Sequence, residues 1–340
     1  VLPMATSAGE MDHFGREARR VLRPRFAVEE HEVHVDAVLA ASPADPDVSA
    51  ELRLQRAELA LQTALARQSG GVTSFVPAME NDVARRRLVD AALRQAIDRG
   101  ELNMVFQPQS RLSDGALVGV EALVRWTSPE LGAVSPAEFI PLAEETGLIV
   151  PLGRFVLLES CRAARRWNWT GTLSVNVSAA QLKLTDVAET VADVLQQTCF
   201  PAGQLDLEIT ESVLVDGADQ RQRTLSALKA LGVGIAIDDF GTGYSSLSYL
   251  SQLSFDKLKV DQSFVRQLTS SPAEAAIVRT VIELAQRLDK VTVAEGLETE
   301  EQLVLLKDMG CDIGQGWLIG KPMPAADIAA RIETTRAALG

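Results

Sequence analysis

Histidine is almost missing from this sequence of 340 residues. The three that occur, His13, His31 and His34, all precede Leu88, and no histidine follows it. A catalytic site in the remaining chain would therefore have no histidine base, no Ser-His-Asp triad and no histidine-rich zinc centre. The HEVH stretch that ends at His34 lacks the HExxH spacing of a zinc-binding helix, and its valines favour a solvent-facing strand.

Cysteine and long apolar runs are also scarce. Cys161, Cys199 and Cys311 are far apart and form no CxxC pair, which predicts reduced thiols in a cytoplasmic protein. No apolar run reaches the roughly 18 residues of a membrane span, and no basic start with an apolar stretch after it predicts a signal peptide. We therefore expect no membrane segment in this stretch, and a start at Val1 is compatible with a piece of a longer protein.

Positive charge is in deficit. The formal net charge is -13, with 33 Lys and Arg against 46 Asp and Glu. This balance argues against a nucleic-acid polymer as partner, because binding to its phosphates needs a basic face. A small anionic ligand remains compatible with the charge, since bound cations can reverse the sign of a local field.

Short apolar strands alternate with longer helical patterns from about Leu102 onward. Such alternation predicts a mainly parallel sheet covered by helices, and eight repeats predict a closed (β/α)8 barrel. An open doubly wound sheet is the main alternative, but no Gly-x-Gly-x-x-Gly opens a helix here. The eight strand candidates are LNMVFQP, LVGVEALVRW, LSVNVS, LDLEIT, GIAIDDF, FDKLKVD, VTVAEGLE and CDIGQGW.

The first 79 residues have a different pattern, typical of a small α+β unit. A helix predicted over residues 80–100 follows, with Asn81 or Asp82 as its N-cap and Gly100 at its end. We expect this helix to connect the small unit to a barrel over residues 101–340.

Polar or charged side chains occur near the carboxyl end of nearly every predicted strand. In a barrel these ends meet at one mouth, so residues far apart in sequence should converge there. The residues are Glu121, Asn176, Glu208, Asp238 with Asp239, Lys259 with Asp261, Glu295 and Gln315.

Five of these residues are candidate carboxylates in one partly buried site. Unpaired, that much negative charge would be costly or would force protonation. Oxygen-rich sites without histidine or cysteine suit Mg²⁺, Mn²⁺ or Ca²⁺, and the adjacent Asp238 and Asp239 can serve two metal ions. Lys259 could then contact the attacking hydroxide or stabilise charge in the transition state. A barrel glycosidase with two carboxylates is a weaker alternative, because it leaves Asn176 and Lys259 unexplained.

Several motifs in the sequence resemble those of one known family. EALVRW at Glu121 to Trp126 resembles the signature of EAL-domain cyclic di-GMP phosphodiesterases. The resemblance covers roughly residues 88–335 and runs in family order through FQPQ, VNVS, EITES, DDFGTGYSSLSYL, LKVD, AEGLE and GQGWLIGKPMP. It implies a modified (β/α)8 barrel whose first strand is antiparallel to the others. Departures are mild (Phe106, Leu297 and Trp317 with Lys321) and remove no metal ligand.

The resemblance also implies a role for each matching residue. Glu121, Asn176, Glu208 and Asp238 match the ligands of a first metal ion, and Asp238 bridges to a second, which Asp239 and Glu295 also bind. Lys259, Glu295 and Asp239 match the catalytic set, with Lys259 beside the nucleophilic water. Gln107, Arg125 and Gln315 match substrate contacts, whereas Glu211, Asp261 and Glu298 match supporting acids, Glu211 holding the loop after the aspartate pair.

The N-terminal unit resembles, less specifically, the C-terminal half of a GGDEF domain. Its stretches FAVEEHEVHVDAVLAASP and AELALQTALARQSGGVTSFVPAM carry the likeness, but the GGDEF signature is absent. We therefore expect a partial, degenerate remnant over residues 1–79 without cyclase activity.

Taken together, the resemblance implies metal-dependent hydrolysis of cyclic di-GMP to linear pGpG by a water activated by two Mg²⁺ or Mn²⁺ ions, with Ca²⁺ inhibitory. It also implies a homodimer formed through the barrel, in the cytoplasmic part of a larger, multidomain or membrane-attached signalling protein. The alternative is a catalytically silent cyclic di-GMP receptor. Such receptors generally lose metal ligands or the loop motif, and this chain keeps both.

Overall fold

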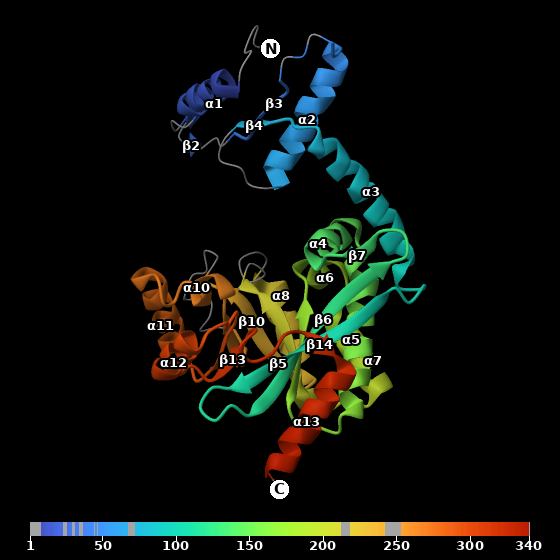
Figure 1. Cartoon of the computed structure of the whole chain (residues 1–340), viewed down its shortest axis with the longest axis vertical. Coiled ribbons are helices and arrows are strands. Elements are labelled where there is room, and N and C mark those ends of the chain that lie inside the picture. The colour runs from blue at the N-terminus through green and yellow to red at the C-terminus, as the bar shows by residue number, and fades with distance from the viewer. Residues whose placement is uncertain are drawn as a thin grey trace. The chain divides into compact units, whose positions relative to one another are not determined.

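Eight strands close into a barrel in the computed structural model of this chain (Figure 1). The structure describes residues 8–22, 26–28, 31–33, 37–43, 45, 47–66, 72–211, 218–241 and 253–339. The barrel strands, in their order around the ring, are β5 (Leu102–Arg111), β6 (Leu117–Ser128), β8 (Thr172–Val177), β9 (Leu205–Thr210), β10 (Gly234–Phe240), β11 (Lys257–Val260), β12 (Val291–Ala294) and β13 (Ile313–Gln315).

The predicted antiparallel first strand is confirmed. β5 pairs antiparallel with both β6 and β13, which closes the ring, whereas the other neighbours pair in parallel. Two short strands extend this sheet beyond the eight predicted ones: β7 (Gly132–Val134) continues antiparallel from β6, and β14 (Met323–Pro324) pairs with β5. Their shortness explains why the sequence pattern did not reveal them.

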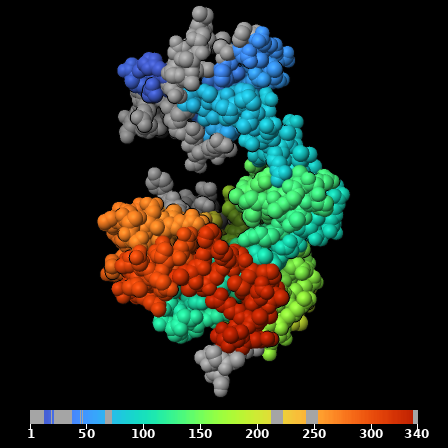
Figure 2. Space-filling model, viewed as in Figure 1, coloured from blue at the N-terminus to red at the C-terminus, as the bar shows by residue number. Residues whose placement is uncertain are grey.

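Helices cover the outside of the barrel (Figure 1). Their apolar residues recur with helical spacing, as in α11, where Val278, Val281, Ile282 and Ala285 are buried. The helices are α4 (Pro136–Thr146), α5 (Ile149–Arg166), α6 (Ala179–Leu184), α7 (Val187–Thr198), α8 (Ala218–Ala230), α10 (Gln262–Arg266), α11 (Pro272–Arg287), α12 (Glu300–Asp308) and α13 (Ala325–Leu339), with a 3-10 turn η1 (Ala202–Gln204) before β9. In Figure 2, α10 and α11 (orange) adjoin α12 and the residues after it (red) on one continuous surface.

Alternation along each strand separates an apolar outer face from a polar interior. On β9, Leu205, Leu207 and Ile209 are buried beneath the helices, so Asp206 and Glu208 between them face into the barrel. Interiors of such barrels are usually filled by branched apolar side chains. Here the strands instead bring charged side chains into the interior, where they need partners.

The chain divides into two compact units, Val1–Val89 and Asp90–Gly340. Described elements of the first unit are α1 (Ala8–Leu22), β1 (Phe26–Val28), β2 (His31–Val33), β3 (Leu39–Ala41), α2 (Ala50–Ala66) and β4 (Val72–Ser74). β1 and β2 pair antiparallel, β3 and β4 pair in parallel, and Ala60, Phe75 and Met79 form a small core. The likeness of this first unit to a GGDEF remnant stays a prediction.

The connecting helix differs from its expected start. α3 (Ala78–Ala96) begins before Asn81 and Asp82, so these residues lie inside its first turns and not at the N-cap. Acidic side chains there are favourable because they face the positive end of the helix dipole. Among the described residues, none of the helices combines the length and apolar character that a membrane crossing requires.

We expect Leu207→Ala to lower the free energy of unfolding of the barrel by about 3 kcal/mol, because it leaves a cavity under the helices. Leu207 is fully buried, whereas Leu184 is 57% exposed. Leu184→Ala, the matched control, should change the same free energy by less than about 0.5 kcal/mol. Urea unfolding followed by tryptophan fluorescence makes the comparison, and equal effects of the two substitutions would contradict the assignment of the core.

Candidate active site

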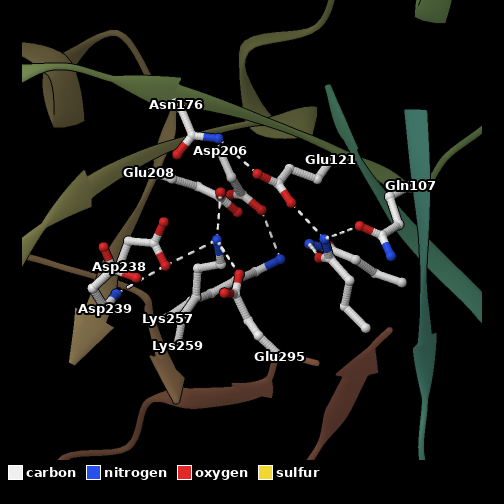
Figure 3. Close-up of polar contacts among 12 residues, drawn as sticks. Gln107, Glu121, Asn176, Asp206, Glu208, Asp238, Asp239, Lys257, Lys259 and Glu295 are labelled. Atoms are coloured by element: carbon white, nitrogen blue, oxygen red, sulfur yellow. Dashed lines mark hydrogen bonds and ion pairs between the residues drawn. The ribbon is translucent and has the colours of Figure 1, made fainter. Parts of the chain in front are cut away.

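The predicted strand-end residues converge at one mouth of the barrel (Figure 3). On β8 to β13 these residues occupy the carboxyl-terminal half of a parallel strand or the position just after it, which brings them to the same level. Glu121 lies in the middle of the longer β6, and Gln107 lies directly opposite it on the antiparallel β5. Figure 3 labels Glu121 on β6, Asn176 on β8, Glu208 on β9, Asp238 and Asp239 on β10, Lys259 on β11, Glu295 after β12 and Gln107 on β5. Gln315 on β13 joins them through hydrogen bonds to Glu121 and Gln107.

Lys259 lies at the centre of this group. Its ammonium Nζ is 2.6 Å from Glu208 Oε2, 2.6 Å from Glu295 Oε1 and 3.0 Å from Asp238 Oδ1. The side chain is 1% exposed, so almost no solvent competes for its three N–H donors. This lysine is therefore the internal counter-ion that links β9, β10 and the end of β12.

A second set of hydrogen bonds holds Glu121. Asn176 Nδ2 donates to Glu121 Oε1 at 2.6 Å, and Gln315 Nε2 donates to the other carboxylate oxygen. Gln315 Nε2 also lies 3.1 Å from Gln107 Oε1, and its own Oε1 accepts from Gln109 Nε2 at 2.8 Å. Two oriented amides thus fix the carboxylate of Glu121 at the opposite side of the mouth from Asp238.

A local bulge in β10 places the side chains of the adjacent Asp238 and Asp239 on the same side of the strand. Consecutive residues of a regular strand point to opposite faces, so Asp238 and Asp239 could not share a site. The pairing of β10 with β11 shifts register between Ile237 and Phe240, and Asp239 adopts a left-handed conformation with φ of 54°. As a result, an oxygen of each of Asp238, Asp239 and Glu295 lies within 4.8 Å of the others.

The electrostatics of the mouth favour more positive charge than Lys259 provides. Burial raises the pKa of Glu208 well above its ordinary value, and burial with the nearby Asp238 raises the pKa of Asp239 to about 6. Burial likewise raises the pKa of Glu295 to about 8 against the opposing effect of Lys259. Burial disfavours the ammonium of Lys259, yet the summed attraction of the surrounding carboxylates, with Glu208 the largest, keeps its pKa well above the ordinary value.

The donor set suits hard divalent cations. Carboxylate and amide oxygens at this mouth are the ligands that Mg²⁺ and Mn²⁺ prefer. At full ionisation, five carboxylates and one ammonium leave an excess of four negative charges, which equals the charge of two divalent ions. Asp238, Asp239 and Glu295 form a cluster that could hold a metal ion.

Glu211 anchors the start of the loop that follows the aspartate pair. Its side chain is buried just after β9, and its Oε2 accepts a hydrogen bond from the Gly241 N–H at 2.8 Å. The role of Glu211 in holding the loop stays a prediction. The predicted loop itself, residues 242–250, lies outside the described residues.

Of the other expected site residues, Asp261 borders the cluster and Glu298 lines the cleft, whereas Arg125 is not among the lining residues. Asp261 caps α10 by accepting from Ser263 N at 2.9 Å, and its side chain also contacts Asp239. Glu298 pairs with Arg266 at 3.3 Å on the rim. Arg125 lies further along β6 and donates to the Val124 carbonyl at 2.9 Å.

A second buried ion pair was not predicted. Lys257 Nζ lies 2.6 Å from Asp206 Oδ2, one layer deeper in the barrel than Lys259 and Glu208 (Figure 3). The signal was present in the sequence, because these two residues precede Lys259 and Glu208 by two positions on the same strands. The barrel interior therefore holds two stacked lysine–carboxylate layers.

The mouth opens into a cleft of about 220 Å³, a volume below the range of about 300–1,000 Å³ that is usual for small-molecule sites. Its floor is the acid cluster. Its lining residues are Gln107, Glu121, Leu123, Asp238, Gln262, Arg266, Glu295, Gly296, Glu298, Gln315, Gly316 and Trp317. Sequence reasoning did not single out Leu123, Gln262 or Arg266, whose types are too common to mark a site.

A match to a known family agrees with this arrangement. The family model described as EAL domain matches residues 90–322. The chain belongs to the EAL domain family.

Curated members of this family share its sequence over most of this chain. It is 38% identical over 322 residues to the bifunctional diguanylate cyclase/cyclic di-GMP phosphodiesterase MucR of Pseudomonas aeruginosa, a match that covers 92% of this chain and 46% of that protein. It is 35% identical over 330 residues to the cyclic di-GMP phosphodiesterase PdeR of Escherichia coli, covering 96% of this chain and 50% of that protein. The chain therefore spans half or less of the length of these relatives.

A solved structure gives the same EAL fold. The structure named PaMucR phosphodiesterase, c-di-GMP complex, superposes with a TM-score of 0.69 at 42% sequence identity. The match covers 71% of this chain and 99% of that one.

The raised pKa of Glu295 sets a pH dependence of stability. A group whose pKa is higher in the folded than in the unfolded protein stabilises the fold most at low pH, and this stabilisation is lost as pH rises from about 4.5 to the folded pKa of about 8. We expect the free energy of unfolding in EDTA to fall over this window. Glu295→Gln should remove more than about 1 kcal/mol of that fall, the equivalent of one pKa unit.

Urea unfolding at a series of pH values measures this effect. The matched control is Glu159→Gln, which removes a half-exposed glutamate paired with Arg162 on α5. If the free energy of unfolding of Glu295→Gln changes with pH as it does in the control and in the parent protein, the surroundings of Glu295 do not raise its pKa.

Proposed function

We propose that this chain hydrolyses cyclic di-GMP to linear pGpG in a metal-dependent reaction. The observation that carries the proposal is the convergence of five carboxylates and Asn176 around the buried Lys259 at the mouth of an EAL barrel. Relatives named as cyclic di-GMP phosphodiesterases support the choice of substrate. A receptor that binds the same nucleotide without cutting it remains the alternative.

Two Mg²⁺ or Mn²⁺ ions are the cofactors in this proposal. Glu121, Asn176, Glu208 and Asp238 would hold one ion, and Asp238, Asp239 and Glu295 the other, which the raised pKa values of the carboxylates support. Bound there, the ions would polarise the phosphoryl group and lower the pKa of the attacking water. We expect Ca²⁺ to bind and to inhibit.

The chain's own residues orient the reactants. Lys259 pairs with both Glu208 and Glu295 and so fixes their positions, and its ammonium could offset negative charge that develops on the phosphate. Gln107, Gln315 and Arg125 are the proposed substrate contacts, and Gln107 and Gln315 already line the cleft. Water adds its oxygen to phosphorus, the bond from phosphorus to the 3′-oxygen breaks, and that oxygen takes a proton, which leaves a linear dinucleotide.

Further parts of the proposal rest on the family resemblance. We propose a homodimer formed through the barrel, and a location in the cytoplasmic part of a longer signalling protein. Residues 1–79 would be a degenerate GGDEF-like remnant without cyclase activity, and residues 80–100 the connection to the barrel. The mass of the purified chain in solution tests the dimer.

The direct test is incubation of the purified chain with cyclic di-GMP and Mg²⁺ or Mn²⁺, with the products separated by chromatography. We expect pGpG, and none in EDTA. Glu121→Gln should lower kcat/KM by more than about 100-fold. Loss of a metal ligand should cost more than the 10- to 100-fold loss of activity that is typical when a residue hydrogen-bonded to a metal ligand is replaced.

Glu159→Gln on α5 is the matched control and should keep full activity. Binding of cyclic di-GMP by the parent protein without any pGpG would reject hydrolysis and favour the receptor. Turnover that persists undiminished in EDTA would reject the metal-dependent reaction.

A further inference from the structure

Trp317 is a large aromatic side chain that lies exposed on the surface of the barrel unit. It is 60% exposed, more than any other large apolar side chain among the described residues 90–339. The other tryptophans of this unit are different: Trp126 and Trp167 are buried, and Trp169 is half-buried. A large aromatic ring exposed beside a polar cleft offers a surface on which the flat, apolar part of a ligand can bind.

The position of Trp317 relates it to the acid cluster. It lines the cleft together with Glu121, Asp238 and Gln315, and it follows Gln315 by two residues at the end of β13. The cleft formed by the described residues has a volume of about 220 Å³, below the usual range of about 300–1,000 Å³ for small-molecule sites. A dinucleotide whose phosphate reaches the acidic floor must therefore extend over the rim, where Trp317 lies.

The backbone around Trp317 is tightly held. The Leu297 N–H donates to the Gln315 carbonyl, and the Leu318 N–H donates to the Leu297 carbonyl, both at 3.0 Å. Between them, a Cβ on Gly316 would lie 2.2 Å from backbone atoms of Leu297, so only glycine permits this approach. The ring is thus presented from a fixed segment, which lowers the entropic cost of binding to it.

One face of the ring is already covered. The ammonium of Lys321 lies 4.9 Å from the centroid of the Trp317 ring, a cation–π contact. Since the ring is nevertheless 60% exposed, a flat aromatic group can stack on it from the side away from Lys321. A purine base is such a group, since base–aromatic stacking needs only a π-face.

We propose that Trp317, backed by Lys321, is the stacking platform for one guanine base of the cyclic dinucleotide. This inference rests on the proposed function, because it places the base relative to the acid cluster that takes the phosphate. Trp317 is then a positioning and affinity residue that does not touch the reacting atoms. Its removal should weaken binding of the base-bearing substrate and leave the acid cluster intact.

The test compares Trp317→Ala, Trp317→Phe and the control Trp169→Ala, whose half-buried tryptophan precedes β8 at the end of that strand away from Asn176. Calorimetric titration with cyclic di-GMP in Ca²⁺ gives Kd without turnover. We expect Trp317→Ala to raise Kd by about 10-fold, the loss typical of one base–aromatic stack. Trp317→Phe should stay within about 3-fold and Trp169→Ala within about 2-fold of the parent protein, because both keep the platform.

Kinetics provide the second readout. For cyclic di-GMP with Mn²⁺, Trp317→Ala should raise KM with little change in kcat, whereas turnover of methyl p-nitrophenyl phosphate, a phosphodiester without a base, should be unchanged. An unaltered Kd in Trp317→Ala, or equal losses on both substrates, would overturn the proposal. If the parent protein cuts neither substrate, hydrolysis is rejected, yet the titration still decides whether Trp317 binds the nucleotide.

Discussion

The contact of one buried ammonium with three carboxylates organises the mouth of this barrel. Lys259 reaches Glu208, Asp238 and Glu295 from the end of β11, and each acid comes from a different part of the sheet. Removing charges from water is costly, and a single lysine does not balance the five acids present. Burial, together with the remaining excess of negative charge, raises the pKa values of Glu208, Asp239 and Glu295, and divalent cations would offset that excess.

The rest of the structure supports this arrangement through the backbone. The bulge in β10 turns Asp239 toward the side of Asp238, and Asp261 contacts Asp239 from the N-terminus of α10. Glu211 ties Gly241, just beyond the bulge, to the end of β9. One layer deeper, the Lys257–Asp206 pair repeats the lysine–carboxylate pattern, so the interior is polar over two layers where apolar filling is usual.

Much of this could be predicted from the sequence, and the failures have physical causes. Strand–helix alternation predicted the barrel, while the antiparallel β5 came only from the family resemblance, because periodicity carries no strand direction. The sequence could not show that Asp239 is left-handed, since a bulge depends on pairing with β11. Asn81 is a good N-cap residue by type, yet α3 begins at Ala78, because local preference is weak against the surrounding fold.

Counting the bound cations shows whether two divalent ions match the excess negative charge at the mouth. Mn²⁺ titration of the purified chain near neutral pH, followed by electron paramagnetic resonance, gives the number bound per chain. We expect two sites in the parent protein and one after Asp239→Asn, because Asp239 is assigned to the second ion only. Absence of saturable Mn²⁺ binding, or an unchanged count in Asp239→Asn, would rule out two cations at this mouth.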